Sequence, residues 1–584
     1  MGRPDLNGSP SQRLALYALL SCLLLIAVNP AMAEISTSEC AWPTSSGSQR
    51  GDHCASCPGP ENPSLVFSRR FDFDEYFSWP YIDGIGPNDI VATHCYTSDA
   101  GSYPMHMLIL HSDGHLILSE SGGGHRVRAL DNERAYISDG GNLVCYRYDG
   151  SQQWMLEDAG SSITPLNDRG VAVWINNGTN NQSYLDIYGE EGELKERIPL
   201  IPAYTRGTRY YNVYNSPVFD GNGLAVWKVS WHEPNPYGGG TGGSTLYYEK
   251  TDDWVDYDGS SSYPGEDYEC YNISKSGFMT TYLDDILVWT GDYAALYSDP
   301  ASKTATWRDS FEGYGYPAYG YACSDPSGAC SFLIYQCDFI DDFTDDKYLT
   351  FEIMHSERDG SSWTRVLDEW DPQDWRIDQD DLKVHGLICD SLGNLYMGVR
   401  GHVLSYTPDG ELRWDFHLSN DDVEVAAIDS RGTLYVARRT HITSRLFALS
   451  DRDPERPKVR AKLVDVPSDQ MYRPGYELRL SLHPYNFGWD ETVDCYIAVQ
   501  LPDDTWLFRA GGGWTDAPTP WLESLLLPNS FEMMDFAVDL GTIPQGTPDG
   551  LYTIFVGFSR PGTLEPVSEL YPVEFRVSPV KRRS

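Results

Sequence analysis

Hydrophobic and polar residues alternate in short runs along most of this chain, and Asp and Gly mark the breaks between runs. Between residues 63 and 452 one unit recurs: an apolar strand, an Asp/Gly turn, a second apolar strand and a polar turn. The clearest copies run from Asp139 to Trp154 and from Asp390 to Trp414. In both, an Asp-Gly pair precedes a short segment that ends in Trp, which is typical of a hairpin turn leading into an outer strand. The pattern predicts an all-β protein.

Eight candidate units are found, with irregular spacing because several carry insertions. The weaker copies begin at Asp113, Asp168, Asp220, Asp284, Asp325 and Asp429. Strand repeats of roughly 30–50 residues favour radial blades, so residues 63–452 predict a β-propeller of seven to eight blades, with eight preferred. A stack of unrelated hairpins or an array of β-sandwiches is the alternative. The segment from Leu65 to Phe73 is placed to close the ring by adding an outer strand to the last blade.

A second set of alternating strands follows the repeats. The charge-rich stretch at residues 453–466 predicts a linker. Beyond it, apolar–polar segments separated by Gly- and Pro-containing turns predict an antiparallel β-sandwich over residues 467–580. The segments are Leu478–Leu482, Val493–Leu501, Phe536–Leu540, Leu551–Phe558 and Val573–Val577.

The charge balance narrows the class of partner. The 584 residues include 85 Asp and Glu against 43 Lys and Arg, a formal net charge of −42. Such an acidic surface repels phosphate backbones, so we expect no nucleic-acid partner. Aromatic residues make up 13% of the chain, which is enough to build a large core and argues against disorder.

The N-terminus predicts export. Two arginines precede an apolar run from Leu14 to Val28, and Ala31-Met32-Ala33 forms a cleavage site, so residues 1–33 are interpreted as a signal peptide. A membrane anchor is the alternative, but the apolar run is shorter than the roughly 20 residues that a spanning helix needs. A lipoprotein signal ending at Cys22 would leave an apolar mature N-terminus. We expect a secreted, periplasmic or cell-surface protein without a transmembrane helix in the mature chain.

Removal of the signal leaves eleven of the 12 cysteines, and export makes disulfides expected. Residues 34–62 form a Cys/Pro/Ser-rich leader without a core of its own. Its Cys54-Ala-Ser-Cys57 motif lacks the strand-to-helix context of a redox enzyme, which favours a structural clip. Cys323 and Cys330 flank a turn and are the disulfide candidate across a hairpin.

The best repeat carries a resemblance to a known superfamily. Asn394-Leu-Tyr396, followed by Tyr406-Thr-Pro-Asp409-Gly410-Glu-Leu-Arg-Trp414, resembles the repeat of the PQQ-like (quinoprotein-dehydrogenase-like) β-propellers. Quinone enzymes of that kind use a vicinal Cys-Cys disulfide, a Trp, a Ca²⁺ ion and a catalytic Asp. This chain has no adjacent Cys pair and no haem motif. PQQ is therefore not expected, and no catalytic or cofactor-binding residue is assigned. The region after residue 467 resembles a C-terminal module of secreted bacterial proteins.

Two groups are candidates for a metal site. His111 and His115 straddle a turn, so their imidazoles could approach across a hairpin. Asp341 and Asp345 lie in an acidic loop whose carboxylates could bind Ca²⁺, although the spacing is not that of an EF-hand. Surface or core histidines and a solvated acidic loop are the alternative interpretations. Calcium is therefore the one cofactor that the sequence leaves as a candidate.

These features favour an exported, non-catalytic binding or scaffold protein. Propeller loops would recognise a protein or glycan partner, and the sandwich would serve as an adhesion or spacer module. The alternative is an exported hydrolase, lyase or quinone-type oxidoreductase with its site at the mouth of the propeller channel. A lipid-anchored outer-membrane assembly factor would require lipidation at Cys22. The sequence names neither the ligand nor the oligomeric state.

Overall fold

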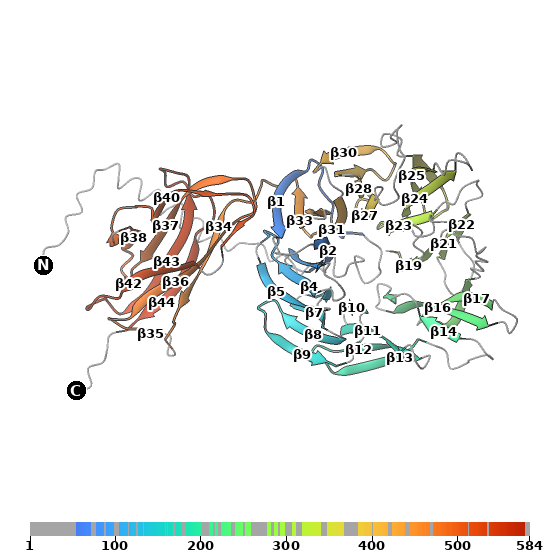
Figure 1. Cartoon of the computed structure of the whole chain (residues 1–584), viewed down its shortest axis with the longest axis horizontal. Helices are drawn as coiled ribbons and strands as arrows, with labels where there is room; N and C mark the ends of the chain where they lie inside the picture. Colours follow the sequence, from blue (N-terminus) through green and yellow to red (C-terminus); the bar gives the residue numbers. More distant parts are fainter. Residues whose placement is uncertain are drawn as a thin grey trace. The chain divides into compact units, whose positions relative to one another are not determined.

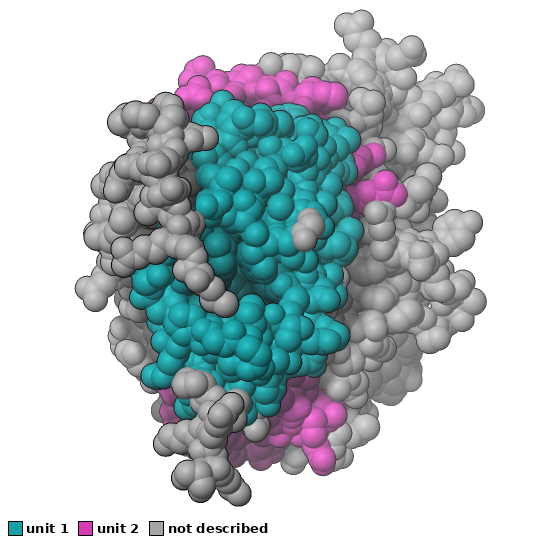
Figure 2. Space-filling model, turned by 90° about the vertical axis from the view of Figure 1, so that its left-hand side faces the viewer, with its two compact units in different colours: residues 1–38, 454–584 teal, residues 39–453 magenta. Residues whose placement is uncertain are grey.

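The computed structural model describes residues 54–578, apart from short stretches at loops and longer ones at 72–76, 98–103, 201–209, 235–239, 258–276, 298–305, 311–317, 340–346, 367–383 and 439–443. The chain divides into two compact units, residues 39–453 and residues 1–38 with 454–584 (Figure 2). We call their described parts the ring unit (54–453) and the C-terminal unit (454–578). All elements of the described residues are strands.

The described residues of the ring unit form eight sheets. In six of them neighbouring strands follow one another in chain order, and the fourth and eighth sheets are the exceptions. The first four sheets contain β2 (Phe77–Gly86), β3 (Ile90–Thr97), β4 (Pro104–Leu110) and β5 (Leu116–Gly123); β6 (Arg126–Leu130), β7 (Arg134–Asp139), β8 (Asn142–Arg147) and β9 (Gln152–Leu156); β10 (Ser162–Leu166), β11 (Gly170–Asn177), β12 (Gln182–Tyr188) and β13 (Leu194–Pro199); and β14 (Tyr210–Val213), β15 (Val218–Phe219), β16 (Ala225–Pro234), β17 (Gly240–Tyr248) and β18 (Thr251–Tyr257).

The remaining four sheets complete the ring unit. They contain β19 (Gly277–Thr280), β20 (Ile286–Trp289), β21 (Tyr293–Tyr297) and β22 (Trp307–Ser310); β23 (Ala318–Ser324), β24 (Cys330–Phe339), β25 (Lys347–Ser356) and β26 (Ser362–Val366); β27 (Val384–Cys389), β28 (Leu395–Val399), β29 (His402–Tyr406) and β30 (Leu412–His417); and β31 (Val423–Ile428), β32 (Leu434–Arg438) and β33 (Ser444–Ser450) joined by β1 (Ser64–Phe71). The eighth sheet thus takes its outer strand from the N-terminal end of the unit.

The sheets are arranged around a ring, as Figure 1 shows. Antiparallel pairing of β1 with β33 places Arg69 opposite Leu446, and β31 contacts β2 of the first sheet. The unit therefore has the architecture of a β-propeller, a fold class predicted from the repeats. The prediction that the segment from Leu65 to Phe73 closes the ring is also confirmed, with the strand at Ser64–Phe71.

Apolar side chains are buried on both faces of the sheets. In β7, Ile137 packs in a cluster with β3, β4 and β6, whereas Tyr136 packs in a cluster with β10 and β11. Successive residues of a strand point to opposite faces, so this sheet fills two separate interfaces. Similar clusters lie between other neighbouring sheets, including the one that joins β23–β26 to β27–β30. This two-sided burial explains the nearly continuous apolar runs of the repeat.

The C-terminal unit consists of two sheets. One contains β34 (Lys458–Val464), β36 (Glu477–Asn486), β41 (Phe531–Glu532) and β42 (Phe536–Thr542), and the other contains β35 (Met471–Tyr472), β37 (Glu491–Gln500), β38 (Trp506–Ala510), β39 (Gly513–Thr515), β40 (Leu522–Leu527), β43 (Gly550–Ser559) and β44 (Tyr571–Val577). Buried side chains from both sheets form a single core that includes Leu480, Val538 and Ile554. Two sheets thus face one another across one apolar layer.

Strand β34 corrects the linker expected at residues 453–466. Its residues alternate between charged and apolar types, with Val459 and Ala461 buried in the core of the C-terminal unit. The high charge of this stretch suggested a linker, but a strand with one solvated face needs polar residues at every second position. The C-terminal unit therefore begins earlier than the predicted boundary at residue 467.

Candidate functional site

The aspartates that begin the repeat turns are buried caps. The Asp390 carboxylate accepts hydrogen bonds from the backbone N–H groups of Leu392 (2.9 Å) and Asn394 (3.0 Å) and from the Tyr396 hydroxyl (2.7 Å). Its side chain is fully buried. A carboxylate accepts several bonds at once, so one residue satisfies donors that the turn would otherwise leave unpaired. The repeat therefore uses this Asp to shape the turn.

Asp429 repeats the arrangement in the eighth sheet. Its carboxylate accepts from the N–H groups of Arg431 (2.9 Å) and Thr433 (2.8 Å) and from the Tyr435 hydroxyl (3.1 Å). Burial, and then the nearby Asp89 carboxylate, raise the pKa of Asp429 above its ordinary value. Arg431 bridges the two acids, with its Nε 2.5 Å from Asp89 and its Nη2 3.6 Å from Asp429. Because Asp89 belongs to the first sheet's hairpin, this pair also links the two ends of the ring.

The end of the predicted leader docks against these two caps. The Gly59 N–H donates to the Asp390 carboxylate (2.9 Å), and the Cys57 thiol donates to the Asp429 carbonyl (2.6 Å). Burial raises the pKa of Cys57 to about 12. A Cβ at position 59 would collide with the Tyr396 hydroxyl, so only glycine fits there. Residues 54–60 therefore dock on the ring unit, with Cys54, Ala55, Gly59 and Pro60 buried, and this part of the predicted leader packs on a core that the sheets provide.

Tryptophans at the outer strands join neighbouring sheets. The indole N–H of Trp154 donates to the Glu190 carbonyl (2.9 Å), and that of Trp363 donates to the Pro408 carbonyl (2.9 Å). Each acceptor lies in the outer turn of the next sheet. Trp414 makes the equivalent bond to the Pro60 carbonyl (3.0 Å), which precedes β1. The docked leader thus replaces the covalent turn that the eighth sheet lacks.

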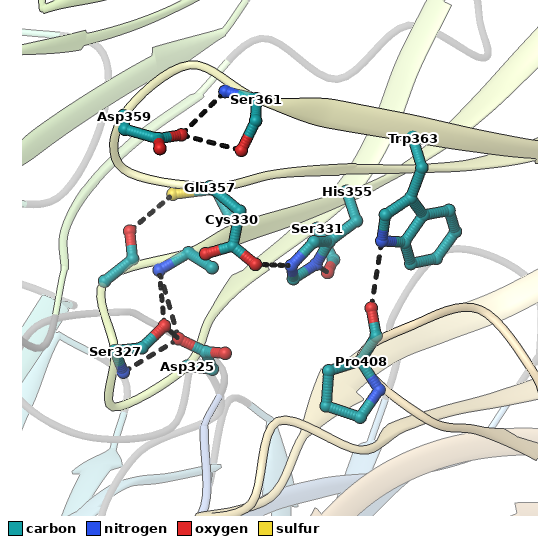
Figure 3. Close-up of polar contacts among 12 residues, drawn as sticks. Asp325, Ser327, Cys330, Ser331, His355, Glu357, Asp359, Ser361, Trp363 and Pro408 are labelled. Carbon is teal, nitrogen blue, oxygen red and sulfur yellow. Dashed lines mark hydrogen bonds and ion pairs between the residues drawn. The ribbon is translucent and has the colours of Figure 1, made fainter.

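A row of polar residues crosses the sheet of β23–β26, with Ser331 and His355 buried and Glu357 exposed at its end (Figure 3). The Ser331 hydroxyl lies 2.8 Å from His355 Nδ1, and Glu357 Oε1 lies 3.4 Å from His355 Nε2. The imidazole stacks on Trp363 at 5.2 Å between ring centroids. Strand pairing fixes the row, because Ser331 is opposite His355 and His355 is opposite Trp363.

The residue types are those of a serine hydrolase, but the arrangement differs. A catalytic serine bonds to Nε2 of the base, while the acid orients Nδ1. Here the serine bonds to Nδ1, and Ser331 and His355 are 3% and 2% exposed. The row is suited to satisfying polar groups between two packed sheets. Sequence reasoning did not identify it, because only the strand register brings these residues together.

The predicted disulfide between Cys323 and Cys330 is wrong. The register pairs Cys323 with Ser331 and Cys330 with Ser324, so the two thiols lie one step apart and point to opposite faces. Cys323 packs with the following sheet and Cys330 with the preceding one. Both cysteines are thiols in the structure.

The metal candidates are only partly described. His111 lies at a turn where its carbonyl accepts the Gly114 N–H (2.8 Å), whereas His115, Asp341 and Asp345 lie outside the described residues. Across the described parts of the chain, no cluster of three or more His, Cys, Asp or Glu is placed to hold a metal ion. In those same parts, no helix has the length and apolar character needed to cross a membrane.

Comparisons with known proteins found structural neighbours alone. No family model matches the chain, and no curated protein matches it. The β-propeller domain of the Trilobed protease from Pyrococcus furiosus is 11% identical, with 66% of this chain and 96% of that chain covered and a TM-score of 0.29. A polysaccharide lyase of family PL25, an ulvan lyase, is 11% identical over 68% and 95%, with a TM-score of 0.29.

A third neighbour is prolyl oligopeptidase B from Galerina marginata, which is 9% identical over 64% of this chain and 56% of that chain, with a TM-score of 0.34. These similarities are too low to transfer an activity. The resemblance of the repeat to the PQQ-like superfamily stays a prediction.

Proposed function

We propose that this chain is an exported, non-catalytic binding or scaffold protein for a protein or glycan partner. The eight sheets would be the eight blades of a rigid propeller frame bearing variable loops, and the C-terminal unit would be an adhesive β-sandwich. The polar chemistry of the ring supports a frame, since Asp390, Asp429 and the outer tryptophans hold turns and neighbouring sheets together.

The observation that carries the proposal is the uneven placement of exposed apolar side chains. Among the described residues, most of the exposed large apolar residues belong to the C-terminal unit, although it is the smaller of the two. They are Val466, Met471, Tyr476, Trp489, Trp514, Leu522, Leu526, Met533, Phe536, Leu551 and Tyr571. Large exposed apolar groups in one module are typical of a surface that binds something.

Three aromatic residues lie along strand β42, and we call them the aromatic edge: Trp514, Trp521 and Phe536. Trp514 and Phe536 belong to the exposed set, and Trp521 packs beside Phe536. The Trp514 indole N–H donates to the Leu540 carbonyl of β42 (3.2 Å). At the beginning of the same strand, Trp521 packs against Phe536 with 6.1 Å between ring centroids. Phe536 and Leu540 are four residues apart on a strand, so the edge extends over about 13 Å.

The chemistry of the aromatic edge suits a sugar chain or an extended peptide. The Arg509 guanidinium lies 5.9 Å from the Trp514 ring centroid and also donates to the Asp539 carbonyl (3.3 Å). Aromatic faces next to a cationic donor offer stacking together with hydrogen bonding. Trp514 and Phe536 are 36% and 40% exposed, so both rings can make new contacts without unfolding.

Binding by the full mature chain to arrays of polysaccharides and of purified extracellular proteins tests the proposal. The triple variant Trp514→Ala, Trp521→Ala, Phe536→Ala is expected to bind at least about tenfold more weakly, equivalent to about 1.4 kcal/mol. Leu551→Ala is the matched control, because Leu551 is 54% exposed on β43 and is not part of the edge. Unchanged binding by the triple variant, or turnover of a bound compound, would contradict the proposal.

A further inference from the structure

Three cysteines meet where the leader docks on the ring. Cys54 precedes β1, Cys323 is on β23 and Cys389 ends β27, and the three share one buried cluster. Their exposed fractions are 6%, 1% and 0%, and all three are thiols in the structure. The cluster therefore gathers sulfur atoms from the N-terminal segment and from two successive sheets.

Backbone pairing brings Cys54 and Cys389 side by side. The two residues form an isolated parallel bridge, and the Ala55 N–H donates to the Cys389 carbonyl (2.9 Å). The Ser391 N–H donates to the Cys57 carbonyl (3.2 Å) on the other side of the bridge. Neighbouring strands lie about 4.8 Å apart. That spacing is within the range of about 4.4–6.8 Å between the Cα atoms of disulfide-bonded cysteines.

Cys389 has a second sulfur neighbour. Burial raises the pKa of Cys389 well above its ordinary value, and hydrogen bonds with the thiols of Cys323 and Cys54 raise it further. The three thiols thus form a continuous group centred on Cys389. Cys57, the other cysteine of the leader motif, points away from this group, since its thiol donates to the Asp429 carbonyl.

We propose that Cys54 and Cys389 form a disulfide that locks the leader to the ring, with Cys323 as the thiol through which the bond is exchanged. A small disulfide of the glutathione type is the oxidant. The Cys54 thiolate attacks it, forms a mixed disulfide and releases one reduced thiol. The Cys389 thiol then attacks the Cys54 sulfur of the mixed disulfide, which forms the Cys54–Cys389 bond and releases the second reduced thiol. The cysteines lose two electrons, which reduce the oxidant, and their two protons are recovered on the two released thiols.

Such a disulfide would hold the closure of the ring covalently, and we call it the latch. The leader joins directly to β1, which completes the eighth sheet. Without the disulfide, individual hydrogen bonds such as those from Gly59 and Trp414 hold the leader. The disulfide would connect positions that are far apart in the chain, and the cross-link of a long loop restricts the unfolded state most.

The test is peptide mapping of the full mature chain after incubation with glutathione disulfide. Remaining thiols are alkylated before reduction, and newly released thiols receive a second label. The expected product is a peptide pair joined through Cys54 and Cys389. Cys57→Ala is expected to keep this pair, and Cys323→Ala is expected to keep it but to slow its exchange with added thiol by about threefold or more.

A stability measurement separates a latch from an incidental bond. Oxidation is expected to raise the urea midpoint of the ring unit's unfolding, and Cys54→Ala should abolish this increase. Cys54→Ala retains the Ala55 and Gly59 backbone contacts, so near-UV circular dichroism can verify that it folds. The proposal is overturned by a Cys323–Cys389 pair in the oxidised wild type, by complete alkylation of all three thiols without reduction, or by an oxidised midpoint equal to the reduced one.

Discussion

The ring unit and the C-terminal unit are both all-β, but they distribute their buried groups differently. The C-terminal unit has one apolar core to which both sheets contribute, including Leu480 and Ile554. The ring unit divides its apolar residues among clusters between successive sheets, and it buries carboxylates such as Asp390 and Asp429 at their turns. A ring has many interfaces and one closure point, so directional polar contacts are needed to fix each neighbour. A pair of sheets facing one another needs mainly a shared core.

The largest effect is expected from removing a buried cap of the ring. Asp390→Ala leaves the N–H groups of Leu392, Asn394 and Gly59 and the Tyr396 hydroxyl without their acceptor. At about 1–3 kcal/mol for each buried unsatisfied group, partly relieved by water, a loss of about 4 kcal/mol is expected. Urea unfolding followed by tryptophan fluorescence measures it.

The C-terminal unit offers a matched carboxylate. Asp494 is also buried, but within the described part of the chain it accepts from two donors, the N–H groups of Ser524 (2.7 Å) and Gly562 (2.8 Å). Asp494→Ala is expected to cost about 2 kcal/mol, and only in the transition of its own unit. Equal losses in the two variants would show that the ring does not depend on its turn caps more than the C-terminal unit does.

The residues of this comparison also show what a single sequence can predict. The Asp and Gly residues of the turns, the alternation of the strands and the closing segment near Leu65 are local signals, and the structure confirms the architecture that they predict. Pairings between distant segments have no local signal. The docking of Cys54 beside Cys389 and the row of Ser331 and His355 depend on register and on ring closure.

The error at Cys323 has the same origin. A turn between two cysteines suggested that they face one another, but a shift of one residue in the register sends their side chains to opposite faces. Strand β34 was missed for a different reason, since its charged residues belong to the solvated face of a strand. Composition alone does not distinguish such a face from a linker.

An intermediate effect is expected from the tryptophan bonds between sheets. Trp414→Phe retains an aromatic ring but removes the donor to the Pro60 carbonyl, which should cost about 1 kcal/mol and weaken closure of the ring. Trp154→Phe removes the corresponding bond to the Glu190 carbonyl. That bond joins two sheets that are consecutive in the chain, so their covalent connection remains. Faster proteolysis at the leader in Trp414→Phe alone is the expected result. Equal proteolysis in both variants would mean that closure is no weaker than the other interfaces.

The smallest effect should appear as a pH dependence at Asp429. Burial and the Asp89 carboxylate raise its pKa in the folded state, so the folded state binds the proton more tightly than the unfolded state does. The resulting stabilisation is complete below the unfolded pKa of about 3.9 and is lost as the pH rises through the folded pKa. Asp429→Asn cannot titrate, so the stability of wild type relative to this variant should decrease from pH 4 upwards. Urea midpoints of both proteins across this range provide the measurement. A difference that stays constant with pH would show that Arg431 fully offsets the two buried acids, and that the closure point carries no excess negative charge.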